Sequence, residues 1–146
     1  MQIREAMTRS VDIADPDMTI DEAARMMAQD DVGFLPVSEN VRLVGMLTDR
    51  DIAVRAVARG KDPARTTVRE AMTNHVLYCY EDEGVETAAE NMARLQVRRM
   101  PVVNRDKRLV GVISLADIAR KCDANHASRA LRHIAEPTRE SLHLPH

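Results

Sequence analysis

Residues 43–53 of this chain read LVGMLTDRDIA, and residues 109–119 repeat the stretch as LVGVISLADIA. Upstream, residues 3–11 (IREAMTRSV) return as residues 68–76 (VREAMTNHV). The two LVG stretches are one residue further apart than the two REAMT stretches. The extra residue enters between Pro101 and Leu109. A one-residue insertion belongs in a loop, so we expect a turn there and at the matching place in the first repeat. An internal duplication of this kind predicts two structural repeats.

We assign residues 1–62 to the first repeat, 63–123 to the second and 124–146 to a C-terminal tail that is partly helical or disordered. The tail begins with a helical pattern, ASRALRHIAE, which Pro137 interrupts. Each half alone would bury little surface, so we expect the two repeats to share a core.

Composition excludes several classes of protein. The 146 residues are 45% hydrophobic and 30% charged, which is typical of a soluble globular chain. No apolar run approaches the roughly 20 residues that a membrane-spanning helix needs. The start, MQIREAM, has no apolar signal core, so we predict a cytoplasmic protein without a membrane partner. The net charge of −2 supplies no global positive field, so we do not expect a nucleic-acid partner.

Hydrophobic periodicity predicts the same order of elements in each repeat, β-α-β-β-α, and therefore an α/β (α+β) fold. Thr19 and Glu22 have capping-box spacing at the start of the first long helix. The predicted elements of the first repeat are a strand at 11–13, a helix from 20, strands at 34–37 and 43–47, and a helix from 48 to about 59. Those of the second are a strand at 76–79, a helix from 85, strands at 100–103 and 109–113, and a helix from 114 to about 122.

The turn G-x-x-[ST]-x-x-D occurs in both repeats, as Gly45–Asp51 and as Gly111–Asp117. Together with the REAMT starts, the x-P-V strands and the order of elements, it resembles the cystathionine-β-synthase (CBS) domain, over about residues 3–121. LTDRDIAVRAVARGKDP and VRRMPVV are similar to stand-alone bacterial CBS-pair proteins, including the hypoxia-response type. The resemblance implies two repeats packed sheet to sheet about a pseudo-twofold axis, and a homodimer formed through helices that include Met26, Met27 and Met92.

The repeated motif also has chemistry that suits a nucleotide. Thr48 and Ser114 each lie at a helix start, where a hydroxyl and unpaired N–H groups can receive a phosphate. Asp51 and Asp117 follow three residues later, and a carboxylate accepts hydrogen bonds from two adjacent ribose hydroxyls. The alternative is that Thr48 and Ser114 only cap their helices while the aspartates complement the helix dipole.

The two repeats differ where phosphate charge would be neutralised. The second has Arg98 and Arg99 ahead of its x-P-V strand, where the resemblance implies phosphate contacts, whereas the first has Gly33 and Phe34. Conversely, the first repeat carries Arg50 within its motif. Arginine makes forked, charge-assisted contacts with phosphate, so we expect two inequivalent sites in the cleft between the repeats. Two further candidates, which would pack against the base, are Ile13 and Tyr78.

These residues predict a regulatory module that senses an adenine nucleotide such as AMP, ATP or NAD, with no obligatory cofactor and with an unknown downstream protein partner. A ligand-independent interaction or structural module is the alternative. Neither repeat contains the paired acid and base or the Gly-rich phosphate loop that catalysis would need, so we do not expect an enzyme.

Cysteine and histidine do not predict a metal site. Cys79 and Cys122 are far apart and outside any metal spacing, so we expect free thiols in preference to a disulfide. His126 and His133 are spaced to share one helix face, but they lack further ligands at a suitable spacing, which disfavours zinc.

Overall fold

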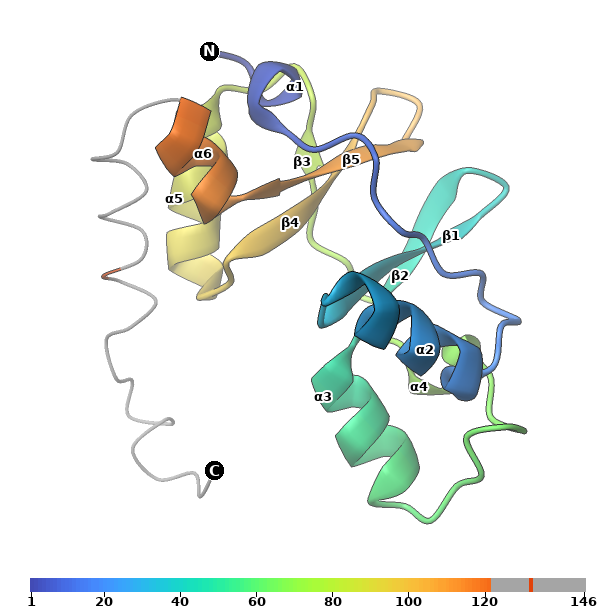
Figure 1. Ribbon diagram of the computed structural model, residues 1–146. Helices are drawn as coiled ribbons and strands as arrows, with labels where there is room; N and C mark the ends of the chain where they lie inside the picture. The colour runs from blue at the N-terminus through green and yellow to red at the C-terminus, as the bar shows by residue number, and fades with distance from the viewer. Residues whose placement is uncertain (122–131, 133–146) are drawn as a thin grey trace. The chain divides into compact units, whose positions relative to one another are not determined.

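The computed structural model describes residues 1–121 and 132, so the tail helix, Cys122 and the tail histidines lie outside the described residues. The chain divides into two compact units. The N-repeat unit comprises Ser10–Tyr78 and Val103–Val110. The C-repeat unit comprises Met1–Arg9, Cys79–Val102 and the described residues from Gly111 onward. The mixture of helices and small sheets confirms the predicted α+β class (Figure 1).

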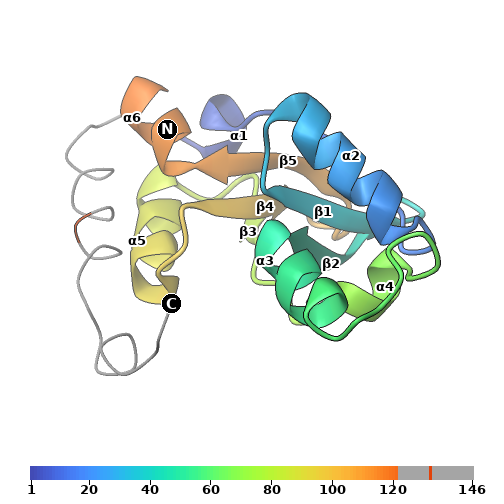
Figure 2. The same ribbon diagram turned by 60° about the horizontal axis from the view of Figure 1, so that its bottom comes forward.

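The N-repeat unit consists of a hairpin and the helices grouped around it (Figure 2). Antiparallel strands β1 (Phe34–Glu39) and β2 (Arg42–Thr48) form the hairpin, and α2 (Ile20–Asp30) precedes it. Half of the predicted capping box of α2 is present: Thr19 Oγ1 accepts from the N–H of Glu22 at 3.2 Å, but no return bond from the Thr19 N–H to the Glu22 side chain is found among the described residues. The remaining helices of this unit are α3 (Asp49–Asp51), η1 (Ile52–Val57) and α4 (Val68–Ala71).

The C-repeat unit is built on a sheet in the order β3 (Cys79–Tyr80), β4 (Arg99–Val103), β5 (Leu109–Ser114). Its helices are α1 (Ile3–Ala6), α5 (Val85–Leu95) and α6 (Leu115–Lys121).

Each unit receives the start of the other repeat. In the C-repeat unit the N–H of Ile3 donates to the carbonyl of Glu83 at 2.8 Å, and in the N-repeat unit Val68 donates in the same way to Met18 at 2.7 Å. These are matching residues of the duplication, so helices α1 and α4 are held by equivalent backbone bonds. The repeat in sequence and the compact unit in space are therefore different divisions of the chain.

The first predicted strand of each repeat needs correction. Residues 11–13 form no strand; instead Ala14 alone bridges to Val37 in parallel. Its N–H donates to Pro36 O, and its carbonyl accepts from Ser38 N. The next ladder bonds on the two sides would need N–H groups on Pro36 and Pro16, which proline lacks.

In the second repeat the strand is Cys79–Tyr80, later than the predicted 76–79. Pro101 matches Pro36 and again removes a donor before the strand. Glu81 stands where the first repeat has Pro16, so the N–H that the ladder needs is present. The single proline difference accounts for a two-residue strand in one repeat and a one-residue bridge in the other.

Helices also differ from the predicted pattern. After Thr48 the first turn, α3, is α-helical, but Ile52–Val57 continues as a π-helix, with Ala58 N donating to Ala53 O at 2.8 Å. The REAMT starts, for which no helix is predicted, form α1 and α4. In α4 the Thr67 N–H donates to Glu70 at 2.7 Å, and this bond lowers the pKa of the Glu70 carboxyl.

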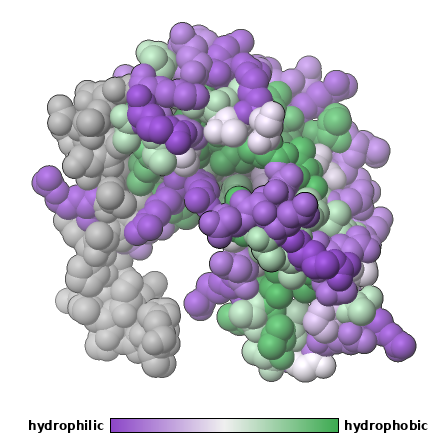
Figure 3. Space-filling view, in the orientation of Figure 1, coloured by the Kyte–Doolittle hydropathy of each residue, from purple (hydrophilic) through white to green (hydrophobic). Residues whose placement is uncertain are grey.

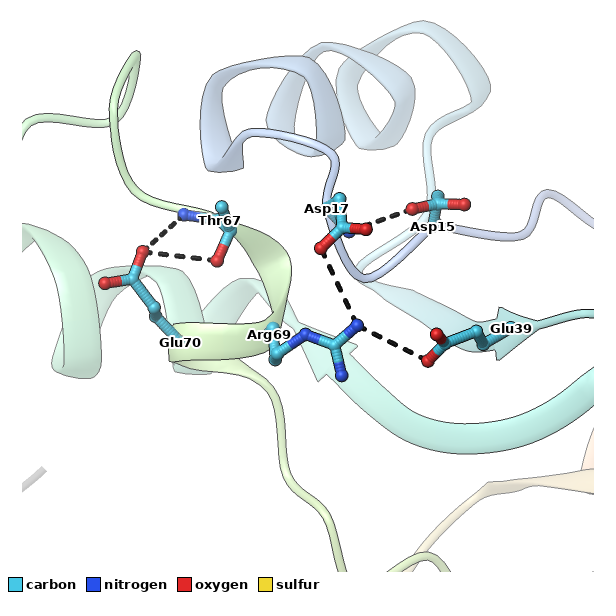
Figure 4. A network of polar contacts seen from close by, with 6 residues as sticks. All are labelled: Asp15, Asp17, Glu39, Thr67, Arg69 and Glu70. Carbon is cyan, nitrogen blue, oxygen red and sulfur yellow. Dashed lines mark hydrogen bonds and ion pairs between the residues drawn. The ribbon is translucent and has the colours of Figure 1, made fainter.

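An ion-pair network fixes α4 against the hairpin (Figure 4). The Arg69 guanidinium lies 3.3 Å from Glu39 Oε2, at the end of β1, and 3.6 Å from Asp17 Oδ1, in the loop before α2. Asp15 accepts from the Asp17 N–H at 2.9 Å, which orders that loop. Because the groups are exposed, each ion pair alone contributes little to the free energy of unfolding. The main effect of the network is to fix the position of α4 relative to the hairpin.

The core of each unit comes from the predicted apolar faces. Met27 and Met92 are buried inside the chain, and Met26 packs against the core of its unit. The expectation that Met27 and Met92 contribute to a dimer surface is therefore wrong, because a helical periodicity does not say which side the core occupies. Within the described residues, no helix is both long and apolar enough to cross a membrane.

Candidate functional site

In the first motif, Thr48 and Asp51 bind each other's backbone. The Asp51 N–H donates to Thr48 Oγ1 at 3.1 Å, and the Thr48 N–H donates to Asp51 Oδ2 at 2.9 Å. This reciprocal pair is a capping box with aspartate in the place of the usual glutamate. One carboxylate oxygen of Asp51 is therefore committed to holding the turn at the end of β2.

The second motif has the same geometry. The Asp117 N–H donates to Ser114 Oγ at 3.0 Å, and the Ser114 N–H donates to Asp117 Oδ2 at 3.0 Å. The duplication is thus reproduced at the level of atoms. In both repeats the helix cap explains the hydroxyl residue, the aspartate and their spacing.

The remaining carboxylate oxygen distinguishes the motifs. Asp117 Oδ1 accepts from the Arg120 guanidinium and from Thr8 Oγ1 at 3.4 Å. Among the described residues, the one contact found for Asp51 Oδ1 is a distant ion pair with Arg55 Nε at 3.9 Å. The side chain of Asp117 is 5% exposed and that of Asp51 is 13% exposed. Asp117 is thus not a surface carboxylate but a buried one with three donors.

The motif glycines allow the REAMT segments to approach. In the N-repeat unit Met46 and Thr73 exchange backbone hydrogen bonds of 3.0 and 2.8 Å, and a Cβ on Gly45 would lie 3.0 Å from Thr73 O. In the C-repeat unit Val112 pairs likewise with Thr8, and a Cβ on Gly111 would lie 2.7 Å from Thr8 O.

Thr8 and Thr73 are therefore parts of the two motif regions that sequence reasoning missed. The duplication of the REAMT and LVG segments indicated that both matter. However, each REAMT segment pairs with the LVG segment of the other repeat, and a sequence pattern does not show such a tertiary contact.

The residue before the x-P-V strand also differs in its surroundings. The Asp49 N–H donates to Gly33 O at 2.9 Å, and the matching Leu115 N–H donates to Arg98 O at 3.0 Å. A Cβ on Gly33 would lie 2.7 Å from Asp49 Oδ2, so the Asp49 carboxylate occupies the space beside Gly33. The first repeat therefore has a carboxylate beside a glycine, whereas the second has Leu115 and Arg98 at the two matching positions.

The other predicted site residues are distributed over both units. Arg50, Arg98 and Arg99 are exposed, and Tyr78 is half-buried. Ile13 is 43% exposed and lines a cavity of about 290 Å³ in the N-repeat unit, with Ala14, Asp15, Ser38, Val41 and Leu109. The structure brings together Thr48, Asp51 and Arg50 in one motif, and Ser114, Asp117 and Arg98 in the other.

The described residues contain no group of three His, Cys, Asp or Glu side chains that could hold a metal ion. Cys79 is buried, and burial with the nearby Glu83 charge raises the pKa of its thiol to about 11. A thiol with this pKa stays protonated at neutral pH and is a poor nucleophile or metal ligand.

Comparison with known proteins explains the duplicated motif. The CBS domain family matches residues 3–57 and again residues 68–124. The chain belongs to the CBS domain family. It is 40% identical over 134 residues to the CBS domain-containing protein YhcV of Bacillus subtilis, covering 91% of this chain and 94% of YhcV. It is 34% identical over 135 residues to hypoxic response protein 1 of Mycobacterium tuberculosis, covering 92% and 94%.

Solved CBS structures share the fold. Hypoxic Response Protein I, with two coordinated zinc ions, has a TM-score of 0.74 at 36% identity, covering 82% of this chain and 98% of that one. The CBS domain pair of MJ0100, in complex with 5′-methylthioadenosine and S-adenosyl-L-methionine, has a TM-score of 0.71 at 30% identity, covering 82% and 94%. CBSX2 in complex with AMP has a TM-score of 0.71 at 25% identity, covering 82% and 93%.

Similarity to enzymes is confined to part of each enzyme. The chain is 36% identical to a homoserine O-acetyltransferase of Methanohalobium evestigatum, but the match covers only 20% of that protein. The rest of that enzyme is not matched by this chain, whereas YhcV is matched over 94% of its length.

Proposed function

We propose that this chain is a regulatory CBS pair that binds an adenine nucleotide and is not itself an enzyme. The observation that supports this most directly is the second carboxylate oxygen of each motif aspartate, which the helix cap does not use. Each motif presents a carboxylate with one oxygen in the helix cap, while the other oxygen meets, within the described part of the chain, side-chain donors alone, which a ligand can replace. Ribose hydroxyls are donors of the same kind. The adenosyl ligands of MJ0100 and the AMP of CBSX2 support the ligand class.

The phosphate side of the proposal favours the second motif. Arg98 and Arg99 bring two positive charges there, whereas the Asp49 carboxylate beside Gly33 would repel phosphate at the matching place in the first motif. We therefore expect one dominant binding event per chain, with ribose at Asp117 and with Thr8 and Arg120 giving up their contacts to Oδ1. Ile13 and Tyr78 remain our candidates for packing against the base.

The first experiment identifies the ligand. Melting of the protein is followed with AMP, ATP, NAD and S-adenosylmethionine, since a ligand at a hundred times its dissociation constant adds about 2.7 kcal/mol. An adenine nucleotide should raise the midpoint, and adenosine should bind much more weakly than AMP. No shift with any compound would favour the alternative, a ligand-independent interaction module in which the two aspartates serve only as helix caps.

The second experiment tests the residues by calorimetric titration of the identified nucleotide. Arg99→Ala should weaken binding about tenfold or more, as expected for a lost charge-assisted contact, while Phe34→Ala at the matching position should not. Arg25→Ala, at an exposed ion pair on α2, is the surface control. Equal affinities for the Arg99 and Phe34 variants would remove the phosphate assignment.

We also propose that the chain acts in the cytoplasm as a homodimer. With Met27 and Met92 inside the core, the exposed apolar candidates on a helix are Val54 and Val57, which are 46% and 61% exposed. Figure 3 shows hydrophobic colour over η1, the helix that carries them. Sedimentation should give twice the chain mass of 16.4 kDa, and a clean monomer at micromolar concentration would contradict the proposal.

A further inference from the structure

Two arginines lie directly opposite each other where the β1–β2 hairpin meets the start of β5. Arg42 and Arg108 form an isolated antiparallel bridge, and both belong to the N-repeat unit. The nearest bond of the bridge runs from the N–H of Leu109 to the carbonyl of Val41 at 3.0 Å. A bond between the flanking residues identifies the narrow, non-hydrogen-bonded kind of pair, in which the Cα atoms are about 4.5 Å apart.

This arrangement places like charges on one face at close range. Residues that are directly opposite in an antiparallel pair project to the same side, and like charges in that position are destabilising. Both arginines are exposed, and no ion pair to either of them is found among the described residues. The positive charge of this arginine pair is therefore not neutralised by an acidic side chain of the described residues.

The neighbouring charges leave the pair unbalanced. Glu39 is the partner of Arg42 on the other strand of the hairpin, but its carboxylate is held by Arg69 at 3.3 Å. The turn before Arg108 adds Lys107, an exposed residue with φ 61°, and one acid, Asp106. The Asn104 amide oxygen accepts from the N–H groups of Asp106 and Arg108 at 3.0 and 3.1 Å, which fixes the turn.

We infer that Arg42 and Arg108, with Lys107 beside them, form a binding site for the phosphate group of a small molecule. Two guanidinium forks on one face can donate to the same tetrahedral oxyanion, and the bound charge relieves the repulsion between them. The site is distinct from the duplicated motifs, which it does not share a residue with. It does not depend on the nucleotide proposal.

Inorganic phosphate and pyrophosphate are the probes that test this inference. Melting is compared in potassium phosphate and in potassium chloride of equal ionic strength, and pyrophosphate affinity is measured by titration. Phosphate should stabilise the wild-type protein beyond chloride. Arg42→Gln and Arg108→Gln should each weaken pyrophosphate binding about tenfold, as expected for the loss of a charge-assisted contact. Arg65→Gln is the matched control, because the Arg65 side chain is 88% exposed and lies outside the pair.

Two further variants separate the sources of the effect. Glu39→Gln should strengthen pyrophosphate binding, since it removes the acid opposite Arg42. Arg99→Ala, which removes a proposed phosphate contact of the second motif, should leave the response that depends on Arg42 and Arg108 unchanged, and this separates the site from nucleotide binding. AMP that competes with pyrophosphate in the Arg99→Ala protein would identify the phosphoryl group of a larger ligand as the source, whereas no competition would indicate the free anion.

Without phosphate and at low salt, Arg108→Gln should raise the melting temperature, because it removes the like-charge contact. Equal effects of phosphate and chloride on the wild-type protein, or an equal loss of affinity in the Arg65 control, would overturn the inference.

Discussion

The two G-x-x-[ST]-x-x-D motifs have the same local geometry and different surroundings. Thr48–Asp51 and Ser114–Asp117 form the same capping box, with bond lengths that agree within about 0.1 Å. Around Asp51 the second oxygen is nearly free, whereas around Asp117 it is closed by Thr8 and Arg120. The duplicated sequence thus gives the same turn in both repeats, but it does not give the two aspartates the same free oxygen for a ligand.

The largest expected difference between the motifs is in stability. Asp117→Ala should lower the free energy of unfolding by about 2 kcal/mol, because it removes the cap and the carboxylate that accepts from Arg120 and Thr8. Asp51→Ala should cost about 1 kcal/mol, the usual value of a lost cap. Urea denaturation of the two variants measures the difference. Equal losses would show that the extra contacts of Asp117 contribute nothing.

Cys79 provides a pH-dependent comparison with Ala14, which holds the same place in the first repeat. The folded thiol has a pKa of about 11, raised from 9.0, so its ionisation opposes folding. The contribution of the neutral thiol to stability should be fully present below pH 9 and should be lost progressively between pH 9 and 11, by about 1 kcal/mol at pH 10. Cys79→Ala should abolish this component of the pH dependence in denaturant titrations, and an identical profile for both proteins would contradict the assignment.

Gly33 tests why the first repeat lacks a side chain before its x-P-V strand. Gly33→Ala should cost about 1 kcal/mol, because the new methyl group meets the Asp49 carboxylate at 2.7 Å. Asp49→Ala should remove most of that cost, so the double variant should be more stable than the two single losses predict. Thermal melting of the four proteins completes the cycle. Additive losses would place the strain elsewhere.

The smallest expected effect concerns the arginines that follow the motifs. Arg120→Gln should strengthen nucleotide binding a few-fold, since ribose no longer competes for Asp117 Oδ1 with a charged neighbour. Arg55→Gln, at 3.9 Å from Asp51, should change affinity little. Titration with AMP compares them. Weaker binding in the Arg120 variant would instead make this arginine a ligand contact.

Local sequence was sufficient to predict some features of the fold. The cap at Thr19, the β1–β2 hairpin and the reciprocal boxes at Thr48 and Ser114 depend on residues within a few positions of one another. The first strands were misplaced because their length depends on the donors of a distant partner. Pro36 and Pro16 lie on different segments, and only their juxtaposition stops the ladder at Ala14.

The sequence by itself determined that there are two repeats, where their hairpins and caps lie, and that the chain has the CBS pattern, because these features rest on duplication and short-range bonds. The tertiary structure decided which segments pair, which aspartate is buried and which arginines face each other. Thr8 reaches Asp117 across 109 positions of the chain, and Arg108 meets Arg42 by a bridge that no local pattern contains. Side-chain availability depends on such distant neighbours, and periodicity along one segment cannot specify them.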